Sequence, residues 1–286
     1  MSVSGQTTQF ATWDAAVRWL RTQADRQALV HDAYYDDPLL GAAERYWRSD
    51  EWHGVRELLP KQGAVLDVGA GRGIASYALA RDGFAVTALE PDGSDLVGAG
   101  AIRSLAREAN LTIKVVEEFS ERLPFEDASF DVVFARAVLH HTRDLTSACR
   151  EFARVLRPGG RMIAVREHVI SRLGDKQAFL DAHPLHHLYG GENAFLLAEY
   201  VQAVERAGLR LRKTIGPLES PINFAPHTLT SLQAEIARRA GRIVPGAAHV
   251  VSSLFAVPGL WRMARSLLSV LDHRPGRLYS FVATKA

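Results

Sequence analysis

The feature that most constrains this sequence is an apolar run that leads directly into a glycine-rich turn. Residues 65–68 are typical of a buried parallel strand, and Gly69, Gly71 and Gly73 follow at alternate positions. Apolar residues then return at helical spacing over residues 74–78. A bare turn between a strand and a helix N-terminus presents backbone N–H groups on which a ligand can rest.

The spacing of these glycines separates several classes of ligand. A dinucleotide fingerprint requires a third glycine where Ile74 stands, and a phosphate-binding loop requires a Gly-Lys-Ser/Thr sequence that is absent. The segment resembles the first motif of the class I S-adenosyl-L-methionine (SAM)-dependent methyltransferases, in which an acidic residue starts the turn and Gly-x-Gly-x-Gly follows. The resemblance implies SAM as the cofactor and implies that it is bound by Asp67, Gly69, Ala70, Gly71 and Gly73.

An acidic residue follows the second predicted strand. Residues 85–89 form that strand, and Glu90 and Pro91 come directly after it. A carboxylate at this position can accept hydrogen bonds from both hydroxyls of a ribose. We predict that Glu90 and Pro91 bind the cofactor; the alternative is that Glu90 is a solvated loop acid.

The third predicted strand, residues 112–116, leads toward a Leu-Pro-Phe triplet at residues 123–125. The triplet resembles a methyltransferase subgroup in which an Asp a few residues earlier bonds the adenine amino group. Phe119 occupies that position here. Three roles stay open: Phe119 stacks on the base, Glu118 reaches the amine, or Phe119 is a buried core residue without a ligand.

Two further segments complete the resemblance. The fourth strand, residues 131–135, is followed by Arg136, at the strand end that faces the methyl donor in that family, and we include Arg136 among the cofactor-binding residues. The Asn/Asp-Pro-Pro-aromatic motif of DNA amino-methyltransferases is missing there. Residues 155–160 read Val-Leu-Arg-Pro-Gly-Gly and predict a turn into a fifth strand at 161–165.

The predicted fold is α/β: a Rossmann-like, seven-stranded, mostly parallel sheet with helices on both faces. The sixth strand is expected at 209–215, and the resemblance implies an antiparallel seventh strand, for which residues 278–284 are the best candidate. The expected domains are a helical N-terminal cap, a SAM-binding core, and a helical insertion before the last strand: residues 1–60, residues 61–215 with 278–286, and residues 216–277.

The cap and the insertion each allow two interpretations. Residues 45–49 of the cap either meet the cofactor or substrate, or only pack on the sheet edge. In the insertion, Thr230 and Gln233 predict the start of one helix, and the apolar spacing predicts another at 258–271. Residues 230–277 hold seven arginines and two acids. Such a basic amphipathic helix either contacts a membrane or lipid-linked substrate, or closes over its own domain.

The candidate catalytic residues are histidines. Methyl transfer to oxygen needs a proton removed, transfer to carbon needs an activated ring, and imidazole suits either task. Six of the eleven histidines lie between residues 140 and 187. We predict His141 or His140 as the base and His187 or His186 as the next candidate; the alternative is that the His-His pair only bonds backbone. The pattern His183-x-x-His186-His187 offers two metal ligands, but without a metal motif we predict no metal site.

These patterns predict a SAM-dependent methyltransferase that acts on a small-molecule or glycan-like acceptor, with O-methylation by a histidine base expected. C- or N-methylation of a natural product or lipid-linked intermediate, or a non-catalytic SAM-binding module, are the alternatives. The net charge of +2 disfavours nucleic acid as a partner. A single cysteine, Cys149, and a polar start at residues 1–9 predict a cytoplasmic protein. The sequence does not indicate an oligomeric state.

Overall fold

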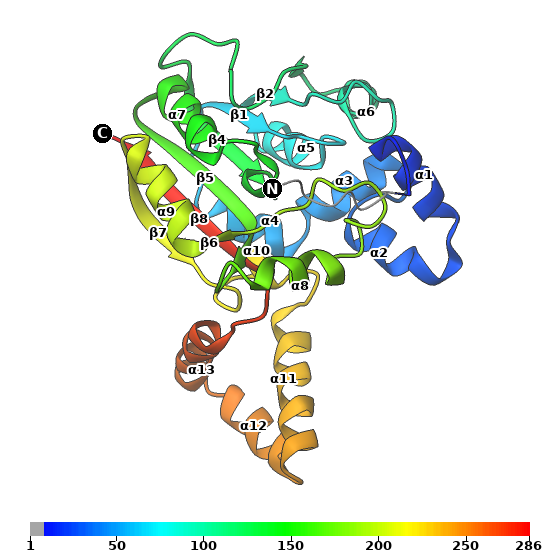
Figure 1. The fold of residues 1–286 in the computed structure, drawn as a ribbon, viewed down its shortest axis with the longest axis vertical. Helices are drawn as coiled ribbons and strands as arrows, with labels where there is room; N and C mark the ends of the chain where they lie inside the picture. Colours follow the sequence, from blue (N-terminus) through cyan, green and yellow to red (C-terminus); the bar gives the residue numbers. More distant parts are fainter. Residues whose placement is uncertain (1–8) are drawn as a thin grey trace.

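The computed structural model describes residues 9–286, and its centre is a mixed sheet (Figure 1). The strand order is β3-β2-β1-β4-β5-β8-β7, with β6 paired to β5 outside this path. The strands are β1 Ala64–Val68, β2 Ala85–Leu89, β3 Ile113–Val116, β4 Phe130–Arg136, β5 Leu156–Ile170, β6 Phe195–Leu196, β7 Leu209–Ile215 and β8 Arg277–Lys285.

The register places β1 at the centre of the parallel part. Leu66 of β1 lies opposite Thr87 of β2 on one side and Val133 of β4 on the other. β8 runs antiparallel to both of its neighbours, β5 and β7. The seven predicted strands are present, and β6 adds a two-residue strand, which is too short to show a period in the sequence.

Helices cover both faces of this sheet. On one face, α7 (Leu145–Val155) and α9 (Leu197–Arg206) bury Phe152 and Tyr200. On the other face, α4 (Asp50–Arg56), α5 (Ile74–Arg81) and α10 (Pro221–Phe224) bury Trp52, Leu79 and Ile222. α6 (Ala99–Glu108) packs beside β3 and α5. The apolar faces of the strands are therefore closed from both sides, as in an α/β layered fold.

The N-terminal part of the described chain is helical, as predicted. It comprises α1 (Trp13–Thr22), η1 (Ala24–Arg26), α2 (Gln27–Asp32), α3 (Leu39–Trp47) and α4. Residues 45–49 take the packing role: the Trp47 indole donates to Asp82 at 2.9 Å, and Ser49 caps α4 by accepting from Trp52 N–H at 3.1 Å. Of the predicted cap, residues 1–8 lie outside the described residues.

The predicted turn at residues 157–160 is an irregular stretch inside β5. The pairing of β4 with β5 shifts between Phe130 and Val132, whose partners are Leu156 and Arg161. Gly159 has a φ of +77° in this stretch. Gly159 and Gly160 thus belong to a local irregularity near one end of the β4–β5 ladder and do not form a separate turn.

The insertion between β7 and β8 divides into a packed part and a projecting part. α10 belongs to the body, whereas α11 (Leu229–Ile243), α12 (Ala247–Phe255) and α13 (Pro258–Leu271) extend away from the sheet (Figure 1). α11 begins at Thr228, which accepts from Ser231 N–H at 3.2 Å, so the predicted cap at Thr230 was wrong by two residues. α12 was not predicted.

No single helix within residues 9–286 has the length and apolar character needed to cross a bilayer. The pair formed by residues 247–255 and 259–271 reaches that length and composition only when taken together, and its two members are bent by 113°.

Candidate active site

A cavity of about 700 Å³ lies beyond the C-terminal ends of β1, β2, β4 and β5. Ligands of open α/β sheets bind at this edge, and clefts for small ligands span about 300–1,000 Å³. One end of the cavity is lined by the turn after β1 and the other by histidines from several segments. Side chains of the N-terminal helices and the loops after them, including Trp13, Tyr34 and Tyr35, also line it.

The glycine turn is shaped differently at its three glycines. Gly69, with φ +60°, lies so close to Val138 that a Cβ would come 2.7 Å from a Val138 methyl carbon. Gly71, with φ +54°, lines the cavity, and a Cβ there would meet only the Val97 carbonyl at 3.9 Å. Gly73 lies outside the lining and packs against Ile102 as α5 begins. Only Gly71 therefore leaves open space that a ligand can use.

Glu90 closes the same end of the cavity. One carboxylate oxygen accepts the Gly71 N–H at 2.7 Å, and the other accepts the Asp92 N–H at 3.0 Å. Each oxygen keeps a second lone pair, so the carboxylate can still accept from a pair of hydroxyls. Burial raises the pKa of Glu90. Pro91 lines the cavity beside it.

Asp67 is a buried acid beneath the turn. Its carboxylate accepts the Ser76 hydroxyl at 2.5 Å and lines the cavity. Desolvation, reinforced by the nearby charge of Glu90, raises the pKa of Asp67 to about 7. Ala70 also lines the cavity, and its N–H donates to the Leu89 carbonyl at 3.1 Å, which ties the turn to β2.

Arg136 reaches the cavity wall from the end of β4, but its charge is already paired. Its guanidinium donates to both oxygens of the buried Glu51 carboxylate, at 2.6 and 3.1 Å. It also lies over the rings of Tyr34 and Tyr46. The pKa of Glu51 is lowered by Arg136 and Arg166 despite its burial. This ion pair fastens α4 to the sheet at the edge of the site.

Glu118 and Phe119 both line the cavity near its rim. Phe119 is 54% exposed, which removes the interpretation of a buried core side chain. The Arg143 guanidinium lies 5.5 Å from the Phe119 ring centre. Glu118 accepts the N–H of Phe119 at 2.9 Å. Both residues remain predictions as adenine contacts.

The histidine end is built on an irregularity in β5. Arg166 has a φ of +61°, and the register with β8 shifts between Ala164 and Glu167. Such a bulge turns the following side chains toward a different neighbour. Here Glu167 accepts N–H groups of Val138, Leu139 and His140 at 3.1 Å each.

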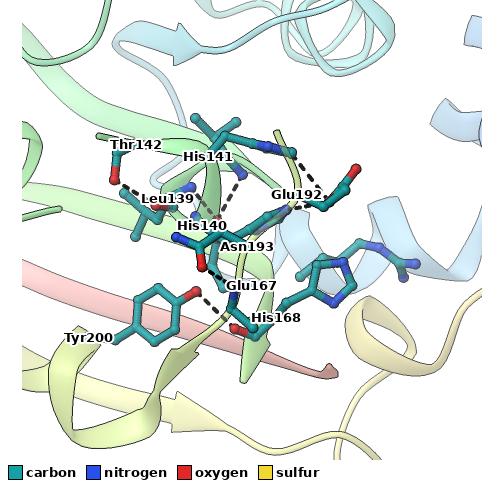
Figure 2. Close-up of polar contacts among 12 residues, drawn as sticks. Leu139, His140, His141, Thr142, Glu167, His168, Glu192, Asn193 and Tyr200 are labelled. Atoms are coloured by element: carbon teal, nitrogen blue, oxygen red, sulfur yellow. Dashed lines mark hydrogen bonds and ion pairs between the residues drawn. The ribbon is translucent and has the colours of Figure 1, made fainter. Parts of the chain in front are cut away.

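Glu167 also fixes the His140 ring. Its carboxylate lies 2.7 Å from Nδ1 of His140, a contact marked in Figure 2. Burial, with His141 and His183 nearby, lowers the pKa of His140 well below its usual value, and burial raises the pKa of Glu167. The His140 imidazole is therefore buried and oriented by Glu167, and its Nε2 points away from that carboxylate.

Four more residues lie near His140. His141 contacts the Gly191 carbonyl through Nδ1 at 2.9 Å, and His168 contacts the Gly276 carbonyl through Nδ1 at 2.8 Å. The Tyr200 hydroxyl donates to the His168 carbonyl at 2.9 Å (Figure 2). Glu192, largely buried, lies 3.8 Å from Nε2 of both His140 and His141.

His183 and His187 differ in their relation to this group. His183 lines the cavity, and burial together with the neighbouring histidines lowers its pKa to about 3. His187 lies outside the lining and contacts the Asp181 carbonyl through Nε2 at 2.9 Å. The structure thus brings His140 and His141 together in the cavity and leaves His187 apart.

Glu192 was missed in the sequence because nothing around it forms a motif. It lies in an irregular segment without helical or strand periodicity, after Gly190 and Gly191. The only signal was its position shortly after the clustered histidines. The carbonyl of the preceding residue, Gly191, contacts Nδ1 of His141 and so holds this segment beside the histidines.

The comparisons with known proteins agree with this geometry. Residues 66–164 match the family described as a methyltransferase domain. A ubiquinone/menaquinone biosynthesis C-methyltransferase from Bradyrhizobium diazoefficiens is 28% identical over 61% of this chain and 71% of that protein. A 27-O-demethylrifamycin SV methyltransferase from Amycolatopsis mediterranei is 34% identical over 46% of this chain and 49% of that protein. The chain thus spans between about half and seven-tenths of these relatives.

Two solved structures share the fold over nearly the whole chain. Geranyl diphosphate C-methyltransferase from Streptomyces coelicolor has a TM-score of 0.58 at 15% identity, covering 96% of this chain and 97% of that one. A protein from Galdieria sulphuraria, described as a sarcosine dimethylglycine methyltransferase, has a TM-score of 0.55 at 17% identity. The likeness covers 99% of this chain and 94% of that one. Both likenesses concern the fold.

The residues at the glycine end fit a nucleoside-type cofactor. Gly71 leaves a gap that a Cβ would fill, and the buried Glu90 carboxylate keeps lone pairs toward it. The family match covers this turn, Glu90 and the strands that carry them. The match over residues 66–164 and the methyltransferase relatives support a SAM-dependent enzyme, with S-adenosyl-L-methionine as the cofactor.

Proposed function

We propose that the protein methylates a hydroxyl oxygen of a small-molecule acceptor and that His141 is the base. The observation that carries this proposal is the continuity of the cavity, which joins the Glu90 end to the histidine end. When bound, SAM supplies an electrophilic methyl group. An acceptor between the two ends lies against imidazoles that can take its proton.

His141 suits this role better than His140. Its Nδ1–H is held by the Gly191 carbonyl, so Nε2 carries the free lone pair. Its side chain is 42% exposed and lines the cavity, whereas His140 is buried and bound to Glu167. Glu192 lies 3.8 Å from Nε2 of His141.

The relatives support a small-molecule acceptor and differ in the atom that is methylated. One is named as a C-methyltransferase of quinone biosynthesis and one as an O-methyltransferase of rifamycin by its 27-O position. Both carbon and oxygen acceptors need a proton removed from the acceptor. The structure of the product is therefore needed to identify the methylated atom.

The test supplies methyl-labelled SAM and a fractionated metabolite extract, and identifies the labelled product by NMR. A methyl ether supports the proposal, and a methyl–carbon bond in an otherwise equivalent product assigns C-methylation instead. With that acceptor, His141→Ala lowers kcat by about 100-fold or more, because general-base catalysis is lost. The Kd for S-adenosylhomocysteine stays within about twofold, since the glycine end is untouched.

The matched control is His53→Ala, which removes an exposed histidine on α4 outside the cavity lining. It leaves kcat unchanged. An unchanged kcat for His141→Ala as well contradicts the assignment of the base.

We also propose that α13 contacts an anionic membrane surface, from which a lipid-linked acceptor can be taken. Its apolar side chains are exposed at helical spacing: Leu260, Met263, Leu267, Val270 and Leu271. Arg262 and Arg265 lie on the same helix, and no acid lies within it. An apolar stripe flanked by arginines suits the headgroup boundary of anionic lipid.

Sedimentation with phosphatidylglycerol vesicles tests this second proposal. We expect the protein to bind them more strongly than phosphatidylcholine vesicles, and we expect Met263→Glu with Leu267→Glu to abolish binding. Leu173→Glu, at an exposed leucine outside the insertion, is the control. Equal binding by all three proteins contradicts the proposal. A dimer that forms without vesicles and is lost in the double variant assigns the surface to a second copy instead.

A further inference from the structure

A group of ligand-type atoms converges at the histidine end without direct hydrogen bonds between them. Nε2 of His140 and Nε2 of His141 each lie 3.8 Å from Glu192, too far for a hydrogen bond. One ligand atom each from His140, His168 and Glu192 falls within 4.8 Å of the others. One ligand atom of each of these three side chains therefore lies around a common point.

We propose that His140, His168 and Glu192 bind a divalent transition-metal ion such as Zn²⁺. Three protein ligands of the type His₂Glu, with one position left open, are the pattern of catalytic zinc sites. Ligands held at about 2.0–2.1 Å from zinc lie about 3–4 Å from one another, close to the 3.8 Å between His140 and Glu192.

The hydrogen bonds behind the two histidines support a metal role. Nδ1 of His140 contacts the Glu167 carboxylate, and Nδ1 of His168 contacts the Gly276 carbonyl. A histidine that binds metal usually donates its other ring N–H to a carboxylate or a carbonyl, which orients the ring and leaves the second nitrogen for the ion. Both rings are therefore already held in the tautomer that a metal requires.

His183 supplies a fourth nitrogen. Its Nδ1 is buried, has no hydrogen-bond partner within the described part of the chain, and lies 3.8 Å from the second oxygen of Glu192. A buried unpaired nitrogen is costly unless something binds it. An ion between His140, His168 and Glu192 gives this nitrogen a nearby positive charge.

The segments explain why no metal motif is visible in the sequence. His140 follows β4, His168 lies in β5, and His183 and Glu192 belong to the irregular segment after α8 (Asp175–Ala182). The spacing searched for in short motifs is local, whereas this set meets only through the fold. The prediction of no metal site rested on the absence of such motifs.

The role of the ion rests on the proposed function, while the site itself does not. An ion held by these residues would lower the pKa of an acceptor hydroxyl in contact with it. The hydroxyl proton would pass to Nε2 of His141, and the methyl group would move from sulfur to oxygen as the carbon–sulfur bond breaks. The products would be the methyl ether and S-adenosylhomocysteine, and the proton would remain on His141 until it is released to water.

Zinc binding is measured on the full chain without acceptor or SAM. The protein is treated with a chelator, returned to metal-free buffer and titrated with Zn²⁺ against a chromogenic chelator. We expect about one equivalent of Zn²⁺, and we expect His168→Ala and Glu192→Gln each to weaken binding by 100-fold or more. The matched control is His187→Ala, a histidine outside the cavity, which keeps the affinity of the unmodified protein.

The outcomes separate the site from the reaction. Weaker Zn²⁺ binding in His168→Ala and Glu192→Gln, with unchanged binding in His187→Ala, supports the site. Equal affinity in all four proteins overturns it. An unmodified protein that does not bind Zn²⁺ overturns it as well. The Kd for S-adenosylhomocysteine, expected to stay within about twofold, shows that each variant is folded. Co²⁺ added in place of Zn²⁺ gives visible absorption bands that His168→Ala abolishes, a second readout independent of methyl transfer.

Discussion

The two ends of the cavity are built in opposite ways. The cofactor end uses nearly contiguous residues: Asp67 lies near the end of β1, Gly69 to Gly71 form the turn after it, and Glu90 bonds back to that turn through the Gly71 N–H. The histidine end gathers side chains from the turn after β4, from β5 and from the segment around Glu192. Contiguous backbone leaves a readable motif, whereas a site assembled from distant segments leaves only scattered residue types.

The two ends also bury different ionisable groups. Burial raises the pKa of Asp67 and of Glu90 at the cofactor end. At the other end, burial lowers the pKa of His168 to about 3 and raises the pKa of Glu167. Desolvation favours the neutral form of each group, so it acts on acids and imidazoles in opposite directions.

The largest expected effect concerns Asp67. Its pKa of about 7 in the folded protein lies above the ordinary 3.8, so between these values the folded state holds a proton that the unfolded chain has released. Raising the pH from 4 to 7 should therefore lower the free energy of unfolding by about 3 kcal/mol through this group. Asp67→Asn should remove this contribution, as denaturant unfolding at several pH values will show. An equal pH dependence of the free energy of unfolding in both proteins contradicts a raised pKa at Asp67.

Glu90→Ala should come next in size. Loss of two charge-assisted hydrogen bonds, at about 1.5 kcal/mol each, raises the Kd for S-adenosylhomocysteine by about 100-fold in calorimetry. The control is Glu117→Ala, which removes an acid paired with Arg103 outside the cavity. If both variants bind equally well, Glu90 does not hold the ribose. Zn²⁺ affinity should be unchanged in either.

The smallest effects distinguish two glycines of one turn. Gly69→Ala should lower the free energy of unfolding by about 2 kcal/mol, since it adds a positive-φ side chain against Val138. Gly71→Ala meets open space and should cost about 1 kcal/mol from its φ alone, yet it should weaken S-adenosylhomocysteine binding. The double variant Gly69→Ala with Val138→Ala should recover part of the loss. Equal destabilisation by both single changes refutes this distinction.

Much of the fold could be predicted because periodicity and glycine placement are local signals. The strands predicted at residues 65–68 and 85–89 lie within one residue of β1 and β2, since buried parallel strands are short apolar runs. The cofactor end followed from the same stretch. The antiparallel last strand was found from the resemblance, despite the long insertion before it.

The remaining parts depended on tertiary contacts. The bulge at Arg166, which directs Glu167 and His168, has no glycine to mark it. The true cap of α11 at Thr228 competed with an equally plausible pattern two residues later. Glu192 is defined only by what surrounds it, and no pattern in one segment can show that.

The position of β8 has a consequence for how the chain is made. β8 lies between β5 and β7, although α10 to α13 separate it from β7 along the chain. During synthesis, β7 thus emerges from the ribosome long before the strand that joins it to the growing domain. Until residues 277–285 have been synthesised, β7 and the apolar face of α9 lack the strand against which they pack. During that interval both surfaces are exposed to binding by a chaperone.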